Sequence, residues 1–260
     1  PAQTKIELGV EYTFNKNKLL SYIENVKISA STDPENLAVN CIRFEIEENK
    51  LKLVSSDTYR LTYIEEELDE NEKNKEGLSV SIPLKTIDGL IKIMRLIDEE
   101  NIIFKSDGTK VFFKFSNVEI LTRVIELQFP DYKSILKNAQ HDKKVLLNTK
   151  DFLSVLKRTL IFVRDNKDAK NGGIFNFENN KLILTGINEN AKIKEELATI
   201  QEGENLKISL NVKFLVDYIS ILDGKVTELK LMNSKSSVLV KDEESDKSLY
   251  FTMPLALREG

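Results

Sequence analysis

The sequence predicts an α+β protein built from two tandem domains, each with two helices packed on antiparallel sheets. The first observation is a strand–turn–strand pattern, FEIEENKLKL at 44–53, that returns as FNFENNKLIL at 175–184. The second is that its surroundings return in the same order, with LSYI at 20–23 matching LSVL at 153–156 and SIPLK at 81–85 matching SLNVK at 209–213. The third is size, because 260 residues with 41% hydrophobic side chains can fill two ordinary cores. Matching pieces at offsets of 128 to 133 residues indicate a duplicated domain.

Each copy is expected to open with a strand that runs into a helix, over 13–30 and 149–165. Two alternating strands follow, joined by the polar turns Glu-Glu-Asn and Glu-Asn-Asn, which suit hairpins. These strands are 39–46 with 50–56, and 173–178 with 181–186. A further strand then leads into a second helix, over 83–98 and 211–223, and Pro83 stands at a first helical turn, where its missing N–H costs nothing. The closing strands are 101–106, 111–116 and 118–126 in one copy, and 226–232, 236–241 and 248–253 in the other.

Two connecting segments differ in character. The segment 65–77, EEELDENEKNKEG, is charged, and we expect it to be a mobile loop without apolar anchors. The segment 129–144 joins the two copies, and its first half carries Phe129, Pro130 and Tyr132, so we expect it to pack as a linker. The predicted domains are therefore 8–128 and 129–257, with 129–144 as the packed linker of the second.

Composition excludes several classes of protein. The single cysteine, Cys41, rules out an intrachain disulfide and suits a reducing cytoplasm. No apolar run reaches the length of about 18 residues that a membrane-spanning helix needs, and no signal peptide opens the chain. We therefore expect a cytoplasmic protein. The first residue is Pro1 rather than Met, so we expect a processed chain or a fragment of a longer one.

The search for catalytic chemistry finds little. The one histidine, His141, lies at the polar end of the linker, where a Ser-His-Asp triad is a poor interpretation, and the counts of His and Cys exclude metal clusters of those residues. Neither GxxxxGK[ST] nor GxGxxG occurs. Acidic runs at 65–67, 98–100 and 242–244 leave a metal-dependent hydrolase open as an alternative, although a solvated surface explains them more simply. We predict no enzyme, no metal and no cofactor.

The charge distribution is more informative than the net charge of −4. The four predicted helices together carry +4, which leaves −8 for the rest of the chain. Ordinary amphipathic helices with solvated lysines give this pattern too. Lysines without interleaved aromatic residues would contact phosphate rather than read bases, if the helices touch nucleic acid.

Four motifs in one order resemble a known family, the beta subunit of bacterial DNA polymerase III, which is a sliding clamp. Ser56-Asp-Thr-Tyr-Arg-Leu61 resembles the family's T-D-G-H-R-L, and Phe129-Pro-Asp-Tyr132 its F-P-D-Y linker. Tyr250-Phe-Thr-Met-Pro-Leu-Ala-Leu257 is similar to its Y-V-V-M-P-M-R-L ending, and Leu210-Asn-Val-Lys213 to its F-N-V-S. Together the motifs span about 250 residues, and each is weak alone.

The resemblance implies a non-enzymatic processivity factor for DNA replication, which encircles duplex DNA and tethers the polymerase. The family's chain has three similar domains, and two chains close a ring lined by helices, so this sequence matches only the second and third domains. The implied partners are duplex DNA, the polymerase III catalytic subunit, the clamp loader and other clamp-binding proteins, with no membrane. The residues implied to face DNA are Lys16, Lys18, Lys27, Lys85, Lys92, Lys150, Lys157, Arg158 and Lys213. Ile161 and Phe162 fall where the third domain contacts the first domain of the other chain.

The resemblance also implies a pocket for short partner peptides. Carried over by motif, it would use Val39, Thr58, Tyr59, Arg60, Leu61, Pro130, Ser134, Ile135, Asn211, Phe214, Ser237, Phe251, Thr252, Met253, Pro254 and Leu255. Thr58-Tyr59 replaces the family's Gly-His, Ser134 stands where Arg is frequent, and Arg258-Glu-Gly260 runs past the usual end. Peptide preference is therefore expected to differ. A two-domain clamp of the archaeal and eukaryotic type, closing as a trimer, and a duplicated interaction module without a DNA role remain alternatives.

Overall fold

The computed structural model describes residues 9–115, 117–164, 170–188 and 191–256, and the chain forms two compact units. Unit 1 is Pro1–Asp131 and unit 2 is Tyr132–Gly260. Each unit is described below by itself. The predicted domain limits Leu8 and Leu257 lie outside the described residues.

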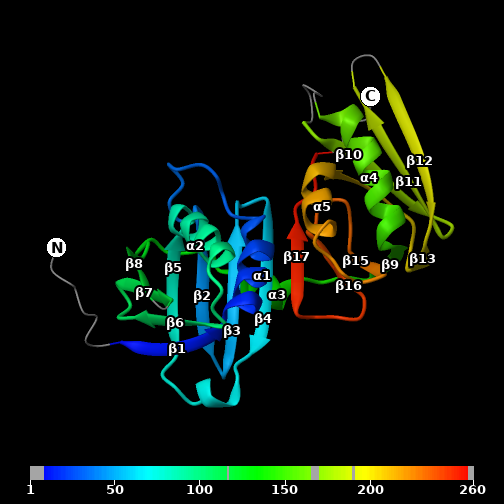
Figure 1. Ribbon diagram of the computed structural model, residues 1–260. Coiled ribbons are helices and arrows are strands. Elements are labelled where there is room, and N and C mark those ends of the chain that lie inside the picture. The colour runs from blue at the N-terminus through cyan, green and yellow to red at the C-terminus, as the bar shows by residue number, and fades with distance from the viewer. Residues whose placement is uncertain (1–8, 116, 165–169, 189–190, 257–260) are drawn as a thin grey trace. The chain divides into compact units, whose positions relative to one another are not determined.

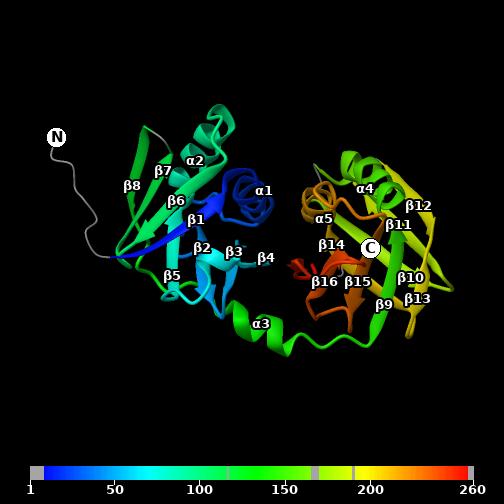
Figure 2. The same ribbon diagram turned by 60° about the horizontal axis from the view of Figure 1, so that its bottom comes forward.

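Unit 1 contains two antiparallel sheets and two α-helices (Figure 1). Its elements are β1 (Val10–Asn15), α1 (Lys16–Lys27), β2 (Cys41–Glu47), β3 (Lys50–Ser56), β4 (Arg60–Glu67), the 3-10 turn η1 (Glu70–Glu72), β5 (Leu78–Pro83), α2 (Leu84–Leu96), β6 (Asn101–Ser106), β7 (Lys110–Phe115) and β8 (Val118–Arg123). One sheet runs β1-β6-β7-β8, and the other strands are ordered β4-β3-β2-β5. Helix α1 contacts β3 and β4, α2 contacts β2 and β5, and the two helices pack beside each other (Figure 2).

The core of unit 1 forms where the two sheets and the helices meet. Phe44 of β2 stacks on Phe104 of β6, with ring centroids 5.9 Å apart. The helices add Leu19, Ile23 and Met94, each at most 1% exposed. Burying an aliphatic or aromatic side chain of this kind contributes about 1.5–3 kcal/mol, so this cluster dominates the stability of the unit.

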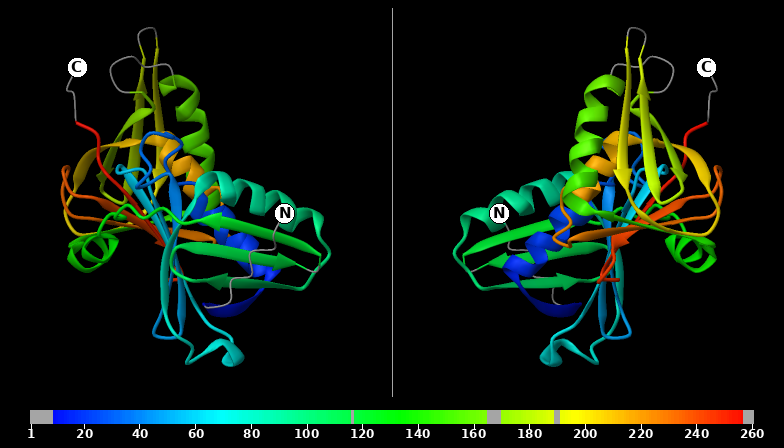
Figure 3. Two further views of the ribbon diagram at one scale, coloured as in Figure 1. Left: turned by 90° about the vertical axis from the view of Figure 1, so that its left-hand side faces the viewer. Right: turned by 90° about the vertical axis from the view of Figure 1, so that its right-hand side faces the viewer.

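Unit 2 repeats the plan with its own helix pair. Its elements are α3 (Tyr132–Asn138), β9 (Lys143–Asn148), α4 (Thr149–Val163), β10 (Gly172–Glu178), β11 (Lys181–Ile187), β12 (Lys192–Ala198), β13 (Ile200–Glu202), β14 (Leu206–Asn211), α5 (Val212–Ile219), β15 (Val226–Leu231), β16 (Val238–Asp242) and β17 (Ser248–Thr252). The sheets are ordered β12-β11-β10-β14 and β13-β9-β15-β16-β17. Helix α4 lies along β11 and β12 and packs against α5 (Figure 3).

Equivalent asparagines start α1 in unit 1 and α4 in unit 2. The side-chain oxygen of Asn15 accepts the backbone N–H of Lys18 at 3.1 Å, and that of Asn148 accepts the N–H of Asp151 at 3.1 Å. Each bond satisfies an N–H that the helix start would otherwise leave unpaired. The α+β prediction, with two main helices per unit on antiparallel sheets, is confirmed.

The expectation for segment 65–77 is wrong. Strand β4 continues to Glu67, so the acidic run belongs to a strand. On the neighbouring strand β3, the Lys50 ammonium donates to the Glu65 carboxylate at 2.6 Å, and such opposite-charge pairs between strands stabilise a sheet. Leu68 is 7% exposed and belongs to the core, and Glu72 is 8% exposed. The buried side chains of Leu68 and Glu72 therefore hold the segment 65–77 in place, although its composition alone predicts a solvated loop.

Other element limits shift by a few residues. Helices α1 and α4 begin after Asn15 and Asn148, and α4 ends at Val163. The predicted end of α4, Asp165, lies outside the described residues. Within the predicted linker 129–144 the chain forms α3 and then the start of β9, and Phe129 and Tyr132 are buried. Strands β12 and β13 were not predicted.

Candidate functional site

The candidate surface of unit 1 is the turn between β3 and β4. The Asp57 carboxylate accepts the backbone N–H groups of Tyr59 and Arg60, both at 3.0 Å, and it also holds the Arg60 side chain through Nε at 2.9 Å. The Ser56 hydroxyl accepts the N–H of Thr58 at 3.1 Å and donates to the Arg60 carbonyl at 2.8 Å. These hydrogen bonds connect the five consecutive residues 56–60 and hold Arg60 in place at the start of β4.

A second turn in unit 1 has the same construction. Ser106 donates to the Lys110 carbonyl at 3.0 Å and accepts the N–H of Gly108 at 3.1 Å. Asp107 accepts the N–H groups of Thr109 and Lys110 at 2.8 and 2.7 Å. The third position has a positive φ in both turns, +86° at Gly108 and +78° at Thr58. Glycine adopts this conformation freely, whereas a β-branched residue is strained in it, so Thr58 carries backbone strain.

The other predicted pocket residues of unit 1 divide into exposed and buried groups. The Tyr59 side chain is 65% exposed beside Arg60. Val39 is 2% and Leu61 3% exposed, so both belong to the interior. Thr58 and Tyr59 are therefore the exposed residues of this turn, whereas the Arg60 side chain, paired with Asp57, is only 13% exposed. Pro130, at the end of unit 1, is half-buried.

The predicted pocket residues of unit 2 gather around β17 and the start of α5. Asn211 caps α5 by accepting the Phe214 N–H at 3.2 Å, and Tyr250 donates to the Phe214 carbonyl at 3.1 Å. The N–H of Leu255 donates to the carbonyl of Ser209 at 2.8 Å, which ties the segment after β17 to β14.

These anchored elements present an apolar side chain to solvent. Met253 is 44% exposed, whereas Phe251 and Thr252 are buried. Ser237, Pro254 and Leu255 are half-buried. On α3, Ile135 is 39% exposed and Ser134 is also exposed. Met253 and Ile135 are thus the exposed large apolar side chains among the predicted pocket residues of unit 2.

Most of the predicted DNA-facing side chains are on helix surfaces. Lys18, Lys85, Lys92, Lys150 and Lys157 are exposed, and none of them forms an ion pair with another described residue. Other cations are engaged. Lys27 pairs with Asp88 at 2.5 Å, and Lys213 pairs with Asp217.

Arg158 is engaged from two sides. Its Nε lies 2.7 Å from a Glu195 oxygen, and its Nη1 lies 2.7 Å from the Ser154 hydroxyl. The hydrogen bond and the opposite charges of the Arg158–Glu195 pair lower the pKa of Glu195 and raise the pKa of Arg158. Contact of Arg158 with an outside anion would have to compete with Glu195.

The expectation that Lys16 faces outward is wrong. Lys16 opens α1, but its side chain is only 7% exposed, and its ammonium donates to the Ile97 carbonyl at 2.5 Å. The carbonyl after the end of α2 is a good acceptor for a cation. Lys16 therefore ties the start of one helix to the end of the next.

The two predicted subunit-contact residues differ in exposure. Ile161 on α4 is 75% exposed. Phe162 is half-buried, and its carbonyl accepts the Asn188 side-chain N–H at 3.0 Å. Ile161 is thus an apolar side chain that the fold of unit 2 leaves uncovered.

The sequence offers two candidate reactive side chains, His141 and Cys41. No group of three or more His, Cys, Asp or Glu side chains in the described ranges is placed to hold a metal ion. His141 is half-buried, and burial together with the nearby Lys230 charge lowers its pKa. Cys41 is fully buried, and burial raises its pKa to about 11. Over the same ranges, no helix is long and apolar enough to cross a bilayer.

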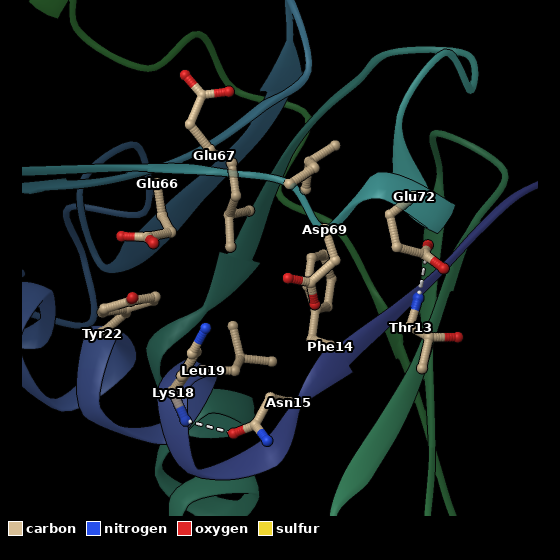
Figure 4. Close-up of a pocket in the computed structure, with 12 residues that line it drawn as sticks. Thr13, Phe14, Asn15, Lys18, Leu19, Tyr22, Glu66, Glu67, Asp69 and Glu72 are labelled. Atoms are coloured by element: carbon tan, nitrogen blue, oxygen red, sulfur yellow. Dashed lines mark hydrogen bonds between the residues drawn. The ribbon is translucent and has the colours of Figure 1, made fainter.

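One pocket in unit 1 was not predicted from the sequence. It lies between β1, α1 and the segment after β4, and Figure 4 shows the residues that line it. The sequence signal for it is the acidic composition of segment 65–77, which by itself predicts a mobile loop. Only the fold shows that this segment borders a pocket.

The fold and these surfaces define a class of protein, a tandem pair of clamp domains. A beta subunit of DNA polymerase III from Thermotoga maritima has the same fold over 99% of this chain and 68% of its own, with a TM-score of 0.90 at 25% identity. Family models describe residues 13–131 as the central domain and 134–256 as the C-terminal domain of the DNA polymerase III beta subunit. This chain therefore belongs to the DNA polymerase III beta subunit family.

Two curated relatives are named beta sliding clamp. The protein from Staphylococcus epidermidis is 26% identical over 240 residues, which cover 91% of this chain and 62% of the relative. The protein from Proteus mirabilis is 26% identical over 253 residues, covering 95% of this chain and 66% of the relative. The chain thus spans a little under two thirds of the length of these relatives.

Proposed function

We propose that this chain acts as the central and C-terminal domains of a sliding clamp, which encircles duplex DNA and holds replication proteins on it. The observation that carries the proposal is the match of two consecutive clamp domains in the family's own order. The work of such a protein is tethering rather than catalysis. A tether raises the effective concentration of a polymerase at its template without new chemistry.

The exposed lysines support DNA contact. Lys85 and Lys92 on α2, and Lys150 and Lys157 on α4, project from helix surfaces and have no described acidic partner. Ammonium groups on flexible stems neutralise phosphate without reading base edges. Contact of this kind is independent of sequence, which is what a sliding protein requires.

Salt dependence tests this contact. Binding of linear duplex should be weak, and log K should fall with log salt by about 0.9 for each phosphate neutralised. Replacing Lys150 and Lys157 by Gln should lower that slope by about 1.8. Lys207→Gln, an exposed lysine on β14, is the matched control and should leave the slope unchanged. Equal slopes in the double variant and the control would contradict the proposed DNA-facing surface.

Partner peptides are proposed to bind the residues carried over by motif, with Tyr59 and Arg60 from unit 1 and Met253 from unit 2. A flexible, exposed methionine is suited to contact varied apolar side chains. Arg60 is held by Asp57 and can orient a polar group of the peptide. The proposed peptide partners are the polymerase III catalytic subunit, the clamp loader and other clamp-binding proteins.

Fluorescence polarisation with a short peptide ending in Leu-Phe tests the pocket. Truncating a central anchor typically costs about 2 kcal/mol or more, roughly thirtyfold in affinity, so Met253→Ala should weaken binding by that factor. Lys157→Ala, on a proposed DNA-facing helix, should leave it unchanged. Leu61→Ala is less informative, because Leu61 is 3% exposed and its truncation perturbs the core. Failure of the wild-type chain to bind would contradict the motif assignment.

In the full-length protein we propose a homodimeric ring, with Ile161 and Phe162 at the contact between subunits. The exposed fraction of 75% at Ile161 supports this, since an isoleucine left uncovered by its own unit is available to a partner. The proposed location is the cytoplasm, where bacterial chromosomal DNA is replicated.

A further inference from the structure

Strand β1 stands at the edge of its sheet in unit 1, which is ordered β1-β6-β7-β8. An edge strand presents backbone N–H and C=O groups that can pair with a strand of another chain, and proteins usually cover such an edge. In unit 1 the edge of β1 is covered by the segment 69–75, which follows β4 and contains η1.

Side chains of this segment bind the edge as the backbone of a strand would. The Glu72 carboxylate accepts the Thr13 N–H at 2.9 Å, in the manner of a strand carbonyl (Figure 4). The Lys75 ammonium donates to the Glu11 carbonyl at 3.0 Å, in the manner of a strand N–H. Thr13 and Glu11 are two residues apart, which is the spacing at which a strand presents groups to the same neighbour.

Unit 2 covers the equivalent edge with a strand, because β13 pairs with β9 and places Ile200 opposite Leu146. Leu146 stands two residues before the N-cap asparagine of α4, and Thr13 stands two residues before that of α1. Thr13 is therefore the counterpart of Leu146. The Glu72 carboxylate thus takes the place that Ile200 has in unit 2.

One asparagine of unit 2 anchors the start of β13. The Asn180 backbone carbonyl accepts the Thr199 N–H, and the Asn180 side-chain oxygen accepts the Gln201 N–H, both at 2.9 Å. The two anchored N–H groups belong to residues two positions apart, so the chain between them is extended.

Unit 1 repeats both anchors with a longer span between them. The Asn49 carbonyl accepts the Leu68 N–H at 2.9 Å, and the Asn49 side-chain oxygen accepts the Asn74 N–H at 2.8 Å. These residues are six positions apart, so unit 1 contains an insertion of four residues, 69–72. The insertion replaces the strand, and it supplies the Glu72 carboxylate.

Lys75 holds this carboxylate in place. The Lys75 ammonium lies 2.7 Å from the Glu72 carboxylate and 5.3 Å from the centre of the Tyr12 ring. The Glu72 side chain is only 10% exposed, so solvent screens this ion pair less than a pair on the surface. Removal of the lysine charge would leave a poorly hydrated carboxylate without its counter-ion, which is strongly unfavourable. The segment would then relax toward a conformation in which Glu72 is hydrated.

We propose that the segment 69–75 is a strap held closed by the Glu72–Lys75 ion pair, and that breaking the pair opens the strap and frees the β1 edge. The closed strap protects this edge from pairing with strands of other chains. Opening also removes one wall of the pocket in Figure 4, because Asp69 and Glu72 line it. The device lies within unit 1 and does not depend on the proposed DNA or peptide contacts.

Amide hydrogen exchange of the whole chain, followed by NMR, tests the strap. Lys75→Met keeps an apolar stem and removes the charge, while the Glu72 carboxylate remains available to Thr13. If the strap opens, the amides of Thr13 and Asn74 should both exchange about tenfold faster or more, the size expected for loss of a hydrogen bond to a charged group. The Leu68 amide, which is anchored before the strap, should keep its wild-type rate.

Lys73→Met is the matched control in the same segment. Lys73 pairs with Glu70 at 2.7 Å, and the Glu70 side chain is 87% exposed, so loss of this pair should leave the exchange rates unchanged. Thermal melts check that both variants are folded. Wild-type rates in Lys75→Met, equal acceleration in both variants, or acceleration that extends equally to Leu68 would each overturn the proposal.

Deletion of residues 69–72 tests the comparison with unit 2. Without the insertion, Lys73 falls where Ile200 stands, and the shortened segment should pair with β1 as β13 pairs with β9. The Thr13 amide should then stay protected although Glu72 is gone, whereas Glu72→Ala should raise its exchange rate about tenfold or more. Equal rates for Thr13 in these two variants would show that the strap does not replace a strand.

Discussion

Replacing Thr58 by glycine should stabilise unit 1. Thr58 has φ of +78°, and it is the β-branched member of a set of positive-φ residues that otherwise consists of asparagines, glycines and Glu48 within the described ranges. Holding a residue in such a region costs about 1–3 kcal/mol. Glycine removes that strain but adds about 0.4–1 kcal/mol of unfolded-state entropy. The Thr58 side chain is exposed, and no hydrogen bond to its hydroxyl is seen, so the net gain in unfolding free energy should be about 1 kcal/mol.

The second turn of this construction, at 106–110, provides a control in which the opposite substitution is made. Gly108 has φ of +86°, and a Cβ built there meets nothing within 4 Å, so Gly108→Thr would add backbone strain without a clash. It should destabilise unit 1 by about 1–2 kcal/mol. Thr58→Asn should fall between wild type and Thr58→Gly, because asparagine tolerates this conformation better than threonine.

Calorimetry measures the effect. One kcal/mol corresponds to a shift in Tm of about 3–6 °C for a unit of this size, so Thr58→Gly should raise and Gly108→Thr should lower the transition of unit 1. A Thr58→Gly variant that melts at or below the wild-type temperature would refute the claim of strain at this turn. It would mean that Thr58 makes a stabilising contact that outweighs the strain.

Further predictions concern packing, titration and charge. Gly186→Ala should destabilise unit 2 by about 1–3 kcal/mol in urea unfolding, because a Cβ there would lie 2.8 Å from Val163 and 2.9 Å from Ile193; a neutral result would show that both side chains can move away. The single imidazole, His141, should titrate by NMR below the ordinary histidine pKa of about 6.5, because burial and the Lys230 charge lower its pKa, and Lys230→Gln should raise that pKa again. Since the folded pKa is the lower one, the stability that His141 contributes is complete above about pH 6.5 and is lost as pH falls through the folded pKa. His141→Gln should remove that part of the pH dependence, and a His141 pKa above 6.5 would contradict the reasoning.

Local patterns were enough to predict the repeated framework. The hairpin turns at 48–49 and 179–180 were recognised from polar residues between alternating strands, and all four of these positions do adopt positive φ. The paired helices were recognised from apolar spacing, which depends on residues three and four positions apart. These features are decided by near neighbours in the chain, so the sequence reports them directly.

Segments whose state depends on distant partners were misread. The composition around Glu65 is that of a solvated loop, but β3 places Lys52 opposite Glu65 and the Lys50 ammonium 2.6 Å from its carboxylate. Lys16 sits on the expected outward side of a helical wheel, but the carbonyl of Ile97, 81 residues away, takes its ammonium into the interior. Charge composition cannot show such pairing, because it contains no information about which residues meet.

By itself the sequence determined the duplication, the α+β class and the family, because repeated patterns and motifs are written in consecutive residues. Only the tertiary structure decided that Thr58 is strained, that Met253 is exposed while Leu61 is buried, and that unit 1 has a pocket where unit 2 adds a strand. The N–H of Leu68 in unit 1 and the N–H of Thr199 in unit 2 make equivalent hydrogen bonds. After them, the segment of unit 2 forms β13 and pairs with β9, whereas the segment of unit 1 forms the turn η1. That choice depends on long-range strand pairing and on one buried carboxylate, Glu72, whose bond to Thr13 joins residues 59 positions apart.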